Sequence, residues 1–208
     1  METKNTRENT PVILDAVARH EMEDQDSVTI FGFWVYLMTD FVMFACLFAT
    51  FAVLHNNTFG GPSAKEIFSL PFVLVETFVL LTSSFTCGLG MLAAHHQKKK
   101  ELFFWFIVTF LLGVVFLVME LTEFRGLIHE GNSFTRSGFL SSYFALVGTH
   151  GLHVFIGLCW MVVLLVQVLR RSFTRHVTRR LILFSIFWHF LDLIWIFIFT
   201  IVYLLSAL

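Results

Sequence analysis

The sequence has little charge for its length. Of its 208 residues, 14% are charged and 57% are hydrophobic, whereas a soluble domain usually carries about 25% charged residues. It also lacks the basic segment and short apolar core of a cleaved secretory signal, so no cleaved peptide is expected. It shows no internal repeat, which leaves an inverted-repeat transporter without support. The low charge excludes an ordinary soluble protein.

Cysteine is equally scarce. The three cysteines lie alone in three different apolar runs, without the close spacing of a metal site, and are expected to be packing or lipid-facing residues: Cys46, Cys87 and Cys159. Cysteine-based metal chemistry is therefore not expected in this chain.

What the sequence has in abundance is long apolar runs, each able to cross a bilayer of about 30 Å. It therefore predicts an all-α polytopic bundle of five transmembrane helices over residues 30–208, preceded by an acidic cytoplasmic tail at residues 1–29. The expected spans are residues 30–54, 70–94, 102–121, 139–169 and 181–205.

Lysine and arginine are distributed unevenly between the two sides of these spans. Eleven of them fall in the tail and in the second and fourth connections, and three fall in the other two connections. The positive-inside rule then places the N-terminus in the cytoplasm and the C-terminus on the opposite side. The arginine-rich fourth connection is bracketed by two spans, which favours topology over nucleic-acid binding as its cause.

Several ionisable residues lie inside the apolar runs, where a central carboxylate costs about 2.5 to 3.5 kcal/mol. Each of them needs a partner, a proton or water. The helical rise of about 1.5 Å per residue places the first of them near the midplane. The candidates are Asp40, Glu76, Glu120, Glu123, His150, His153, His189 and Asp192.

The histidines and Asp192 lie at overlapping depths in the fourth and fifth spans. His150 and His153 share a helical face, and so do His189 and Asp192, whose spacing permits contact with each other or with a neighbouring helix. We expect an interhelical polar cluster. A metal or haem site and a proton relay remain open, although three deep histidines favour hydrogen bonding between helices.

The carboxylates have several readings. Asp40 has apolar neighbours, and a special role for it stays open beside a structural one. Glu76 precedes a run of small polar residues suited to close packing. Glu120 and Glu123 share a face, and we expect Arg125 to neutralise one of them.

Four separated segments resemble a known family. They are residues 31–40 (FGFWVYLMTD), 76–81 (ETFVLL), 150–154 (HGLHV) and 188–192 (WHFLD). Together they resemble subunit III of haem-copper respiratory oxidases, most closely the five-helix form in bacterial cytochrome o ubiquinol oxidases. The resemblance extends from about Ile30 to the C-terminus.

The resemblance implies an accessory subunit of a proton-pumping complex of the bacterial inner membrane that reduces dioxygen to water. Such a subunit has no catalytic, cofactor-binding or metal residues of its own. It packs against catalytic subunit I, which holds haem and copper, and against other subunits and membrane lipids. The family carboxylate matching Asp40 lies near a cleft that holds phospholipid, and a role in proton uptake is implied there. Glu76 departs from the longer family form, which commonly has a neutral residue.

Three alternatives remain at this point. The chain can be subunit III of a cytochrome c oxidase, or a free-standing proton or ion transporter that uses its intramembrane carboxylates. A membrane metalloenzyme would use His150, His153 and His189 as ligands.

Overall fold

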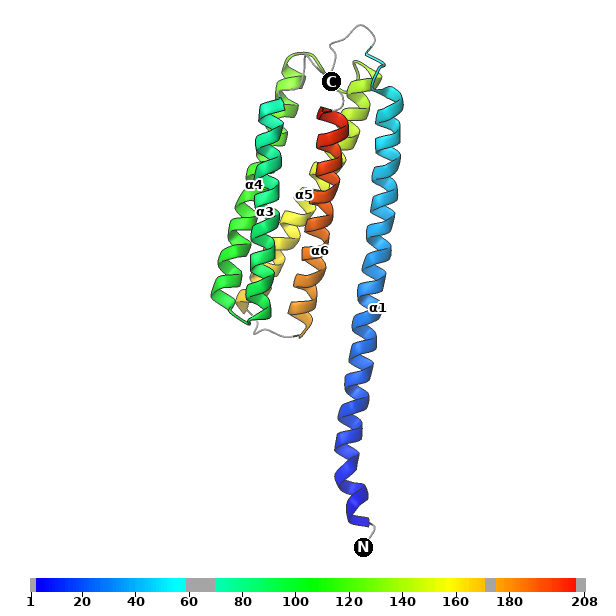
Figure 1. The fold of residues 1–208 in the computed structure, drawn as a ribbon, viewed down its shortest axis with the longest axis vertical. Coiled ribbons are helices and arrows are strands. Elements are labelled where there is room, and N and C mark those ends of the chain that lie inside the picture. Colours follow the sequence, from blue (N-terminus) through cyan, green and yellow to red (C-terminus); the bar gives the residue numbers. More distant parts are fainter. Residues whose placement is uncertain (1–2, 59–69, 171–174, 205–208) are drawn as a thin grey trace. The chain divides into compact units, whose positions relative to one another are not determined.

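The regular structure of the chain is helical throughout the part that the computed structural model describes. Residues 3–58, 70–170 and 175–204 are described, with side chains from Ser27 onward except that of Arg175. The elements in chain order are α1 (Thr3–Leu54), α3 (Leu70–His95), α4 (Lys99–His129), α5 (Gly138–Arg170), α6 (Arg175–Ile198) and a short π-helix, η1 (Phe199–Leu204) (Figure 1).

Among the described residues, five helical stretches are long and apolar enough to cross a membrane. The spans are Ser27–Leu54, Leu70–His95, Lys99–His129, Gly138–Arg170 and His176–Leu204. A helix satisfies its own backbone N–H and C=O groups, which hydrocarbon cannot do, so apolar runs of this length fold as helices. The predicted all-α chain with five spans is confirmed.

Three boundaries differ from the sequence-based expectation. α1 begins at Thr3, so the acidic tail is helical and continuous with the first span. α4 continues to His129 instead of ending near Leu121, because Leu127 is still buried. The left-handed Gly131, with a φ of +79°, follows two residues after the last helical residue. Gly tolerates this left-handed conformation at a helix end. α6 begins inside the arginine-rich connection, at Arg175.

The chain divides into two compact units, residues 1–40 and 41–208. The first unit is the N-terminal part of α1. The second contains the remainder of α1 and the bundle of α3, α4, α5 and α6, in which α3 and α4 form an antiparallel hairpin across a tight turn (Figure 1). Gln97 has a φ of 54° in that turn, and Lys98 N–H donates to the carbonyl of Ala93 at 3.0 Å.

The indole of Trp188 on α6 joins the other three helices of the bundle. Its Nε1–H donates to Ser83 Oγ on α3 at 3.1 Å, and its ring packs on Gly113 of α4 and Gly157 of α5. A Cβ added at either glycine would lie 3.0 Å from a ring atom of Trp188. Glycine is needed at both positions because a larger residue would push the indole out of its site.

Aromatic rings fill the core farther along the bundle, two helical turns after Trp188 on the same face of α6. Phe116 of α4 meets Trp195 of α6 edge to face with centroids 4.7 Å apart. The second part of α1 packs through Phe51, whose ring lies 6.0 Å from that of Phe139 on α5. Each of these four side chains is at most 2% exposed, so aromatic rings form a closely packed part of the core.

We predict that Gly157→Val destabilises the bundle by about 1 to 3 kcal/mol, because overpacking displaces Trp188 and Phe187. Thermal unfolding in detergent can be followed with a thiol-reactive dye at Cys87, which is fully buried, after Cys46 and Cys159 are changed to serine. The matched control is Gly126→Val, since a Cβ at Gly126 meets nothing within 4 Å. Equal midpoints for the two variants would contradict the prediction.

Candidate functional site: polar groups between the helices

Three glutamates gather between α3 and α4. Glu76 is fully buried and Glu120 is 2% exposed. Glu120 lies close enough to both Glu76 and Glu123 for the charges of the carboxylates to repel one another. Neither carboxylate oxygen of Glu76 has a hydrogen-bond partner among the described residues. The sequence placed Glu120 and Glu123 together, and the structure adds Glu76 from the preceding helix.

Two tyrosines complete one side of this glutamate group. The Tyr203 hydroxyl on η1 donates to Glu123 Oε2 at 3.2 Å, and it shares a 2.9 Å hydrogen bond with the Tyr143 hydroxyl of α5. No ion pair joins Glu123 to Arg125 in the described part of the chain, and Arg125 is exposed. The expectation that Arg125 neutralises a glutamate is therefore wrong, because Glu123 faces the bundle interior and Arg125 faces outward.

Glu120 also fixes the packing of α4 against α5. Its carboxyl group lies directly on the backbone of Gly151, where an added Cβ would come within 2.9 Å of Glu120 Cδ. The glycine leaves the space that the carboxyl group occupies. Gly151 thereby allows the carboxyl group on α4 to approach the backbone of α5 closely.

His150 lies in an aromatic cage. Its ring is fully buried and sits 5.3 Å from Trp195, 6.0 Å from Phe116 and 6.4 Å from Phe44. Neither of its ring nitrogens has a hydrogen-bond partner among the described residues. The arrangement packs the imidazole as an aromatic ring.

His153 makes different contacts one turn away. Its Nδ1 lies 2.7 Å from the carbonyl of Thr149, and its ring packs 5.4 Å from Phe44. His150 and His153 thus share Phe44 as a neighbour. No group of three or more His, Cys, Asp or Glu residues suited to a metal ion occurs within the described ranges. The metalloenzyme hypothesis gains no ligand set from this geometry.

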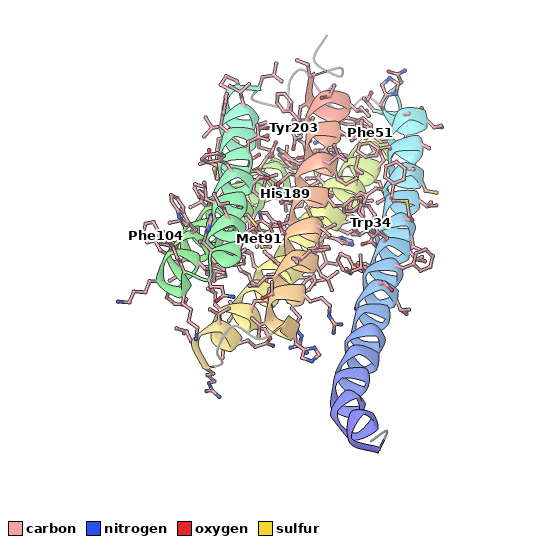
Figure 2. All side chains as sticks on the ribbon, turned by 60° about the horizontal axis from the view of Figure 1, so that its bottom comes forward. Trp34, Phe51, Met91, Phe104, His189 and Tyr203 are labelled. Atoms are coloured by element: carbon pink, nitrogen blue, oxygen red, sulfur yellow. The ribbon has the colours of Figure 1, made fainter. Side chains whose placement is uncertain are left out.

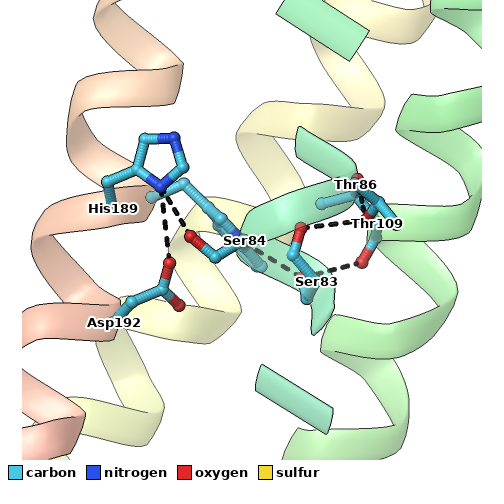
Figure 3. A network of polar contacts seen from close by, with 7 residues as sticks. Ser83, Ser84, Thr86, Thr109, His189 and Asp192 are labelled. Atoms are coloured by element: carbon cyan, nitrogen blue, oxygen red, sulfur yellow. Dashed lines mark hydrogen bonds and ion pairs between the residues drawn. The ribbon is translucent and has the colours of Figure 1, made fainter. Parts of the chain in front are cut away.

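His189 contacts Asp192 on its own helix and also a side chain on a neighbouring helix. His189 Nδ1 lies 3.6 Å from Asp192 Oδ2 on the same helix and 2.6 Å from Ser84 Oγ on α3 (Figure 3). Asp192 is buried, whereas the His189 side chain is 46% exposed. The expected interhelical polar contact therefore links α6 to α3, and His150 on α5 is not part of it.

The small polar run of α3 connects this contact to α4. Ser83 Oγ accepts from Trp188 and donates to the Thr109 carbonyl at 3.4 Å, while the Thr86 and Thr109 hydroxyls lie 2.9 Å apart (Figure 3). Each hydroxyl faces a neighbouring helix at close range. The run has the packing role predicted from its composition.

Asp40 lies at the end of the first unit, on α1. It interacts with the side chain of Tyr36, one helical turn earlier, and the hydroxyl of Thr39 donates to the Tyr36 carbonyl at 2.6 Å. Spacing of four residues places Tyr36 and Asp40 on one face. The carboxyl group therefore has a local partner within its own helix.

An apolar cleft of about 260 Å³ opens between the second part of α1 and the C-terminal helices. Aromatic side chains dominate its walls, and Phe48 and Phe197 face each other across 6.4 Å. Its lining residues are Phe41, Phe44, Ala45, Phe48, Ile194, Phe197 and Ile201. It offers no charged or hydrogen-bonding side chain, so it suits a hydrocarbon chain.

Sequence reasoning missed three residues that hold the polar groups. Tyr143, Tyr203 and Trp188 each supply a donor to a group on another helix. A buried Tyr or Trp in a membrane span usually needs a partner for its O–H or N–H, and this rule was the available signal. The identity of each partner depends on helix packing, which spacing along one helix does not reveal.

Comparison with known proteins gives a consistent assignment. The family model described as cytochrome c oxidase subunit III matches residues 15–207. A cytochrome bo(3) ubiquinol oxidase subunit 3 from Pseudomonas aeruginosa is 56% identical over 185 residues, covering 89% of this chain and 88% of the relative. The protein of the same name from Buchnera aphidicola is 44% identical, covering 86% and 92%. A probable quinol oxidase subunit 3 from Staphylococcus saprophyticus is 42% identical, covering 92% and 96%. The chain belongs to the cytochrome c oxidase subunit III family.

Proposed function

We propose that this multi-pass membrane protein is a non-catalytic accessory subunit of a proton-pumping haem-copper ubiquinol oxidase, and that it stabilises the catalytic subunit. The similarity to ubiquinol oxidase subunits 3 along most of both chains carries the proposal. Haem and copper then belong to the partner catalytic subunit.

Ubiquinol is the electron donor that fits best. The family model carries the name of cytochrome c oxidase, but the relatives named above are quinol oxidase subunits. The five spans also match the shorter quinol-oxidase form expected from the sequence. We place the chain in the bacterial inner membrane with its N-terminus in the cytoplasm, as the basic residues indicate.

Purification of the tagged chain from its native membrane in mild detergent tests this proposal. We expect a haem-containing catalytic subunit to co-purify in a fixed ratio, and the isolated chain to carry no haem of its own. A chain that purifies without any haem protein would contradict the accessory role. Proton flux through the purified chain alone in liposomes would support the transporter hypothesis instead.

We also propose that the cleft between α1 and the C-terminal helices holds an acyl chain of a membrane phospholipid. Its walls are aromatic and aliphatic, and burial of apolar surface favours a hydrocarbon occupant.

Ala45→Trp should fill this cleft, because Ala45 is its smallest lining residue. Native mass spectrometry of the purified complex should then show fewer retained phospholipids than in the wild type. Ala49→Trp is the matched control, since Ala49 is exposed on the same helix and does not line the cleft. Equal lipid retention in the two variants would argue against an occupant in the cleft.

Asp40 supports the durability or proton coupling of the complex in this proposal. Asp40→Ala removes a carboxyl group within a span of a subunit without redox centres. We expect unchanged haem content with a shorter lifetime during turnover or fewer protons translocated per electron. Asp40→Glu, which keeps the carboxyl group, should retain most of the wild-type behaviour. Wild-type lifetime and proton stoichiometry in Asp40→Ala would contradict this role.

A further inference from the structure

One exposed surface of the bundle combines apolar side chains with a histidine, a serine and a glycine. Much of the outward surface of α4 and α5 near mid-membrane is aliphatic, as Leu111 and Val118 of α4 and Ile156 of α5 illustrate, each at least half exposed. The surface where α6 adjoins α3 also carries His189, labelled in Figure 2, together with Ser84 and Gly88. We call this surface the α3–α6 face and define it by Leu81, Ser84, Gly88, Ile182, His189 and Leu193.

His189 is the polar centre of the α3–α6 face. Its Nδ1 takes the contacts with Ser84 and Asp192, and its Nε2 has no hydrogen-bond partner in the described part of the chain. The helical rise places it roughly 12 Å beyond Leu181, the first apolar residue after the arginines. It therefore lies within the hydrocarbon layer, where neither water nor an acyl chain can bond Nε2.

Gly88 gives the same face room for a close neighbour. It follows Ser84 by four residues, so both lie on one side of α3. Gly88 is exposed, and an added Cβ would meet nothing within 4 Å. At Gly90, by contrast, the side chain of Phe106 on α4 occupies the space that a Cβ would take. Small residues spaced by four allow two membrane helices to approach closely.

We propose that the α3–α6 face is the docking surface for a transmembrane helix of the haem-bearing catalytic subunit. That helix presents a hydrogen-bonding side chain to His189 Nε2 and packs closely over Ser84 and Gly88. The inference rests on the proposed function, and it names the side of the bundle that the partner covers. A protein helix is the occupant because it supplies both a polar group at this depth and a surface that fits a glycine.

Site-specific photo-crosslinking in native membranes tests the docking face. A photoreactive side chain at Leu193 should crosslink to the catalytic subunit, whereas the same group at Leu111 on α4 should not. Both residues are about half exposed, at 47% and 56%. Crosslinking from Leu111 alone, or from Leu193 only to lipid or to a second copy of this chain, would overturn the proposal.

A steric pair of variants provides an independent test. Gly88→Leu and Gly126→Leu place the same side chain at exposed glycines with open space around the Cβ. We expect Gly88→Leu to reach the membrane in normal amount but to lose most of its co-purification with the catalytic subunit. Gly126→Leu should co-purify as the wild type does. Equal co-purification of both variants would refute the proposal that the α3–α6 face is the docking surface. Failure of the wild type to co-purify would refute the accessory role itself.

Discussion

The bundle depends on one indole ring. Trp188 of α6 donates a hydrogen bond to α3 and packs against glycines of α4 and α5, so a single side chain positions four helices. Lipid tails are as apolar as a leucine side chain, so close packing and hydrogen bonds have to hold membrane helices together. Trp188 supplies both, and the glycines beneath it allow the helices to come near enough.

The bundle also buries glutamates and His150, and burial of such polar groups without partners costs free energy. Glu76 and His150 are fully buried, without hydrogen-bond partners among the described residues. Such groups are expensive in a membrane, and membrane proteins usually bury them inside a bundle. Here Trp195 and Phe116 pack against His150, and Tyr203 donates a hydrogen bond to Glu123. Aromatic residues of the core therefore pack directly against polar groups inside the bundle.

The sequence was sufficient for the spans but not for the contacts between them. Apolar length predicted the fourth span at residues 139–169, close to the observed Gly138–Arg170, because a bilayer sets that length directly. The partner of Glu123 was predicted incorrectly, since Tyr203 lies 80 residues away in sequence and reaches it only through helix packing. The contact of His189 with Asp192 was predictable from i, i+3 spacing, whereas that with Ser84 required the neighbouring helix.

The tight connection between α3 and α4 has a consequence for biogenesis. These two helices are joined by a short turn around Gln97 and share the bonds between Thr86, Thr109 and Ser83. Contacts between residues close in sequence form faster than distant ones. The hairpin can therefore assemble as soon as both helices have left the insertion machinery, before α6 is synthesised. Ser83 and Gly113 of the hairpin then form a packing site for Trp188 before α6 is inserted.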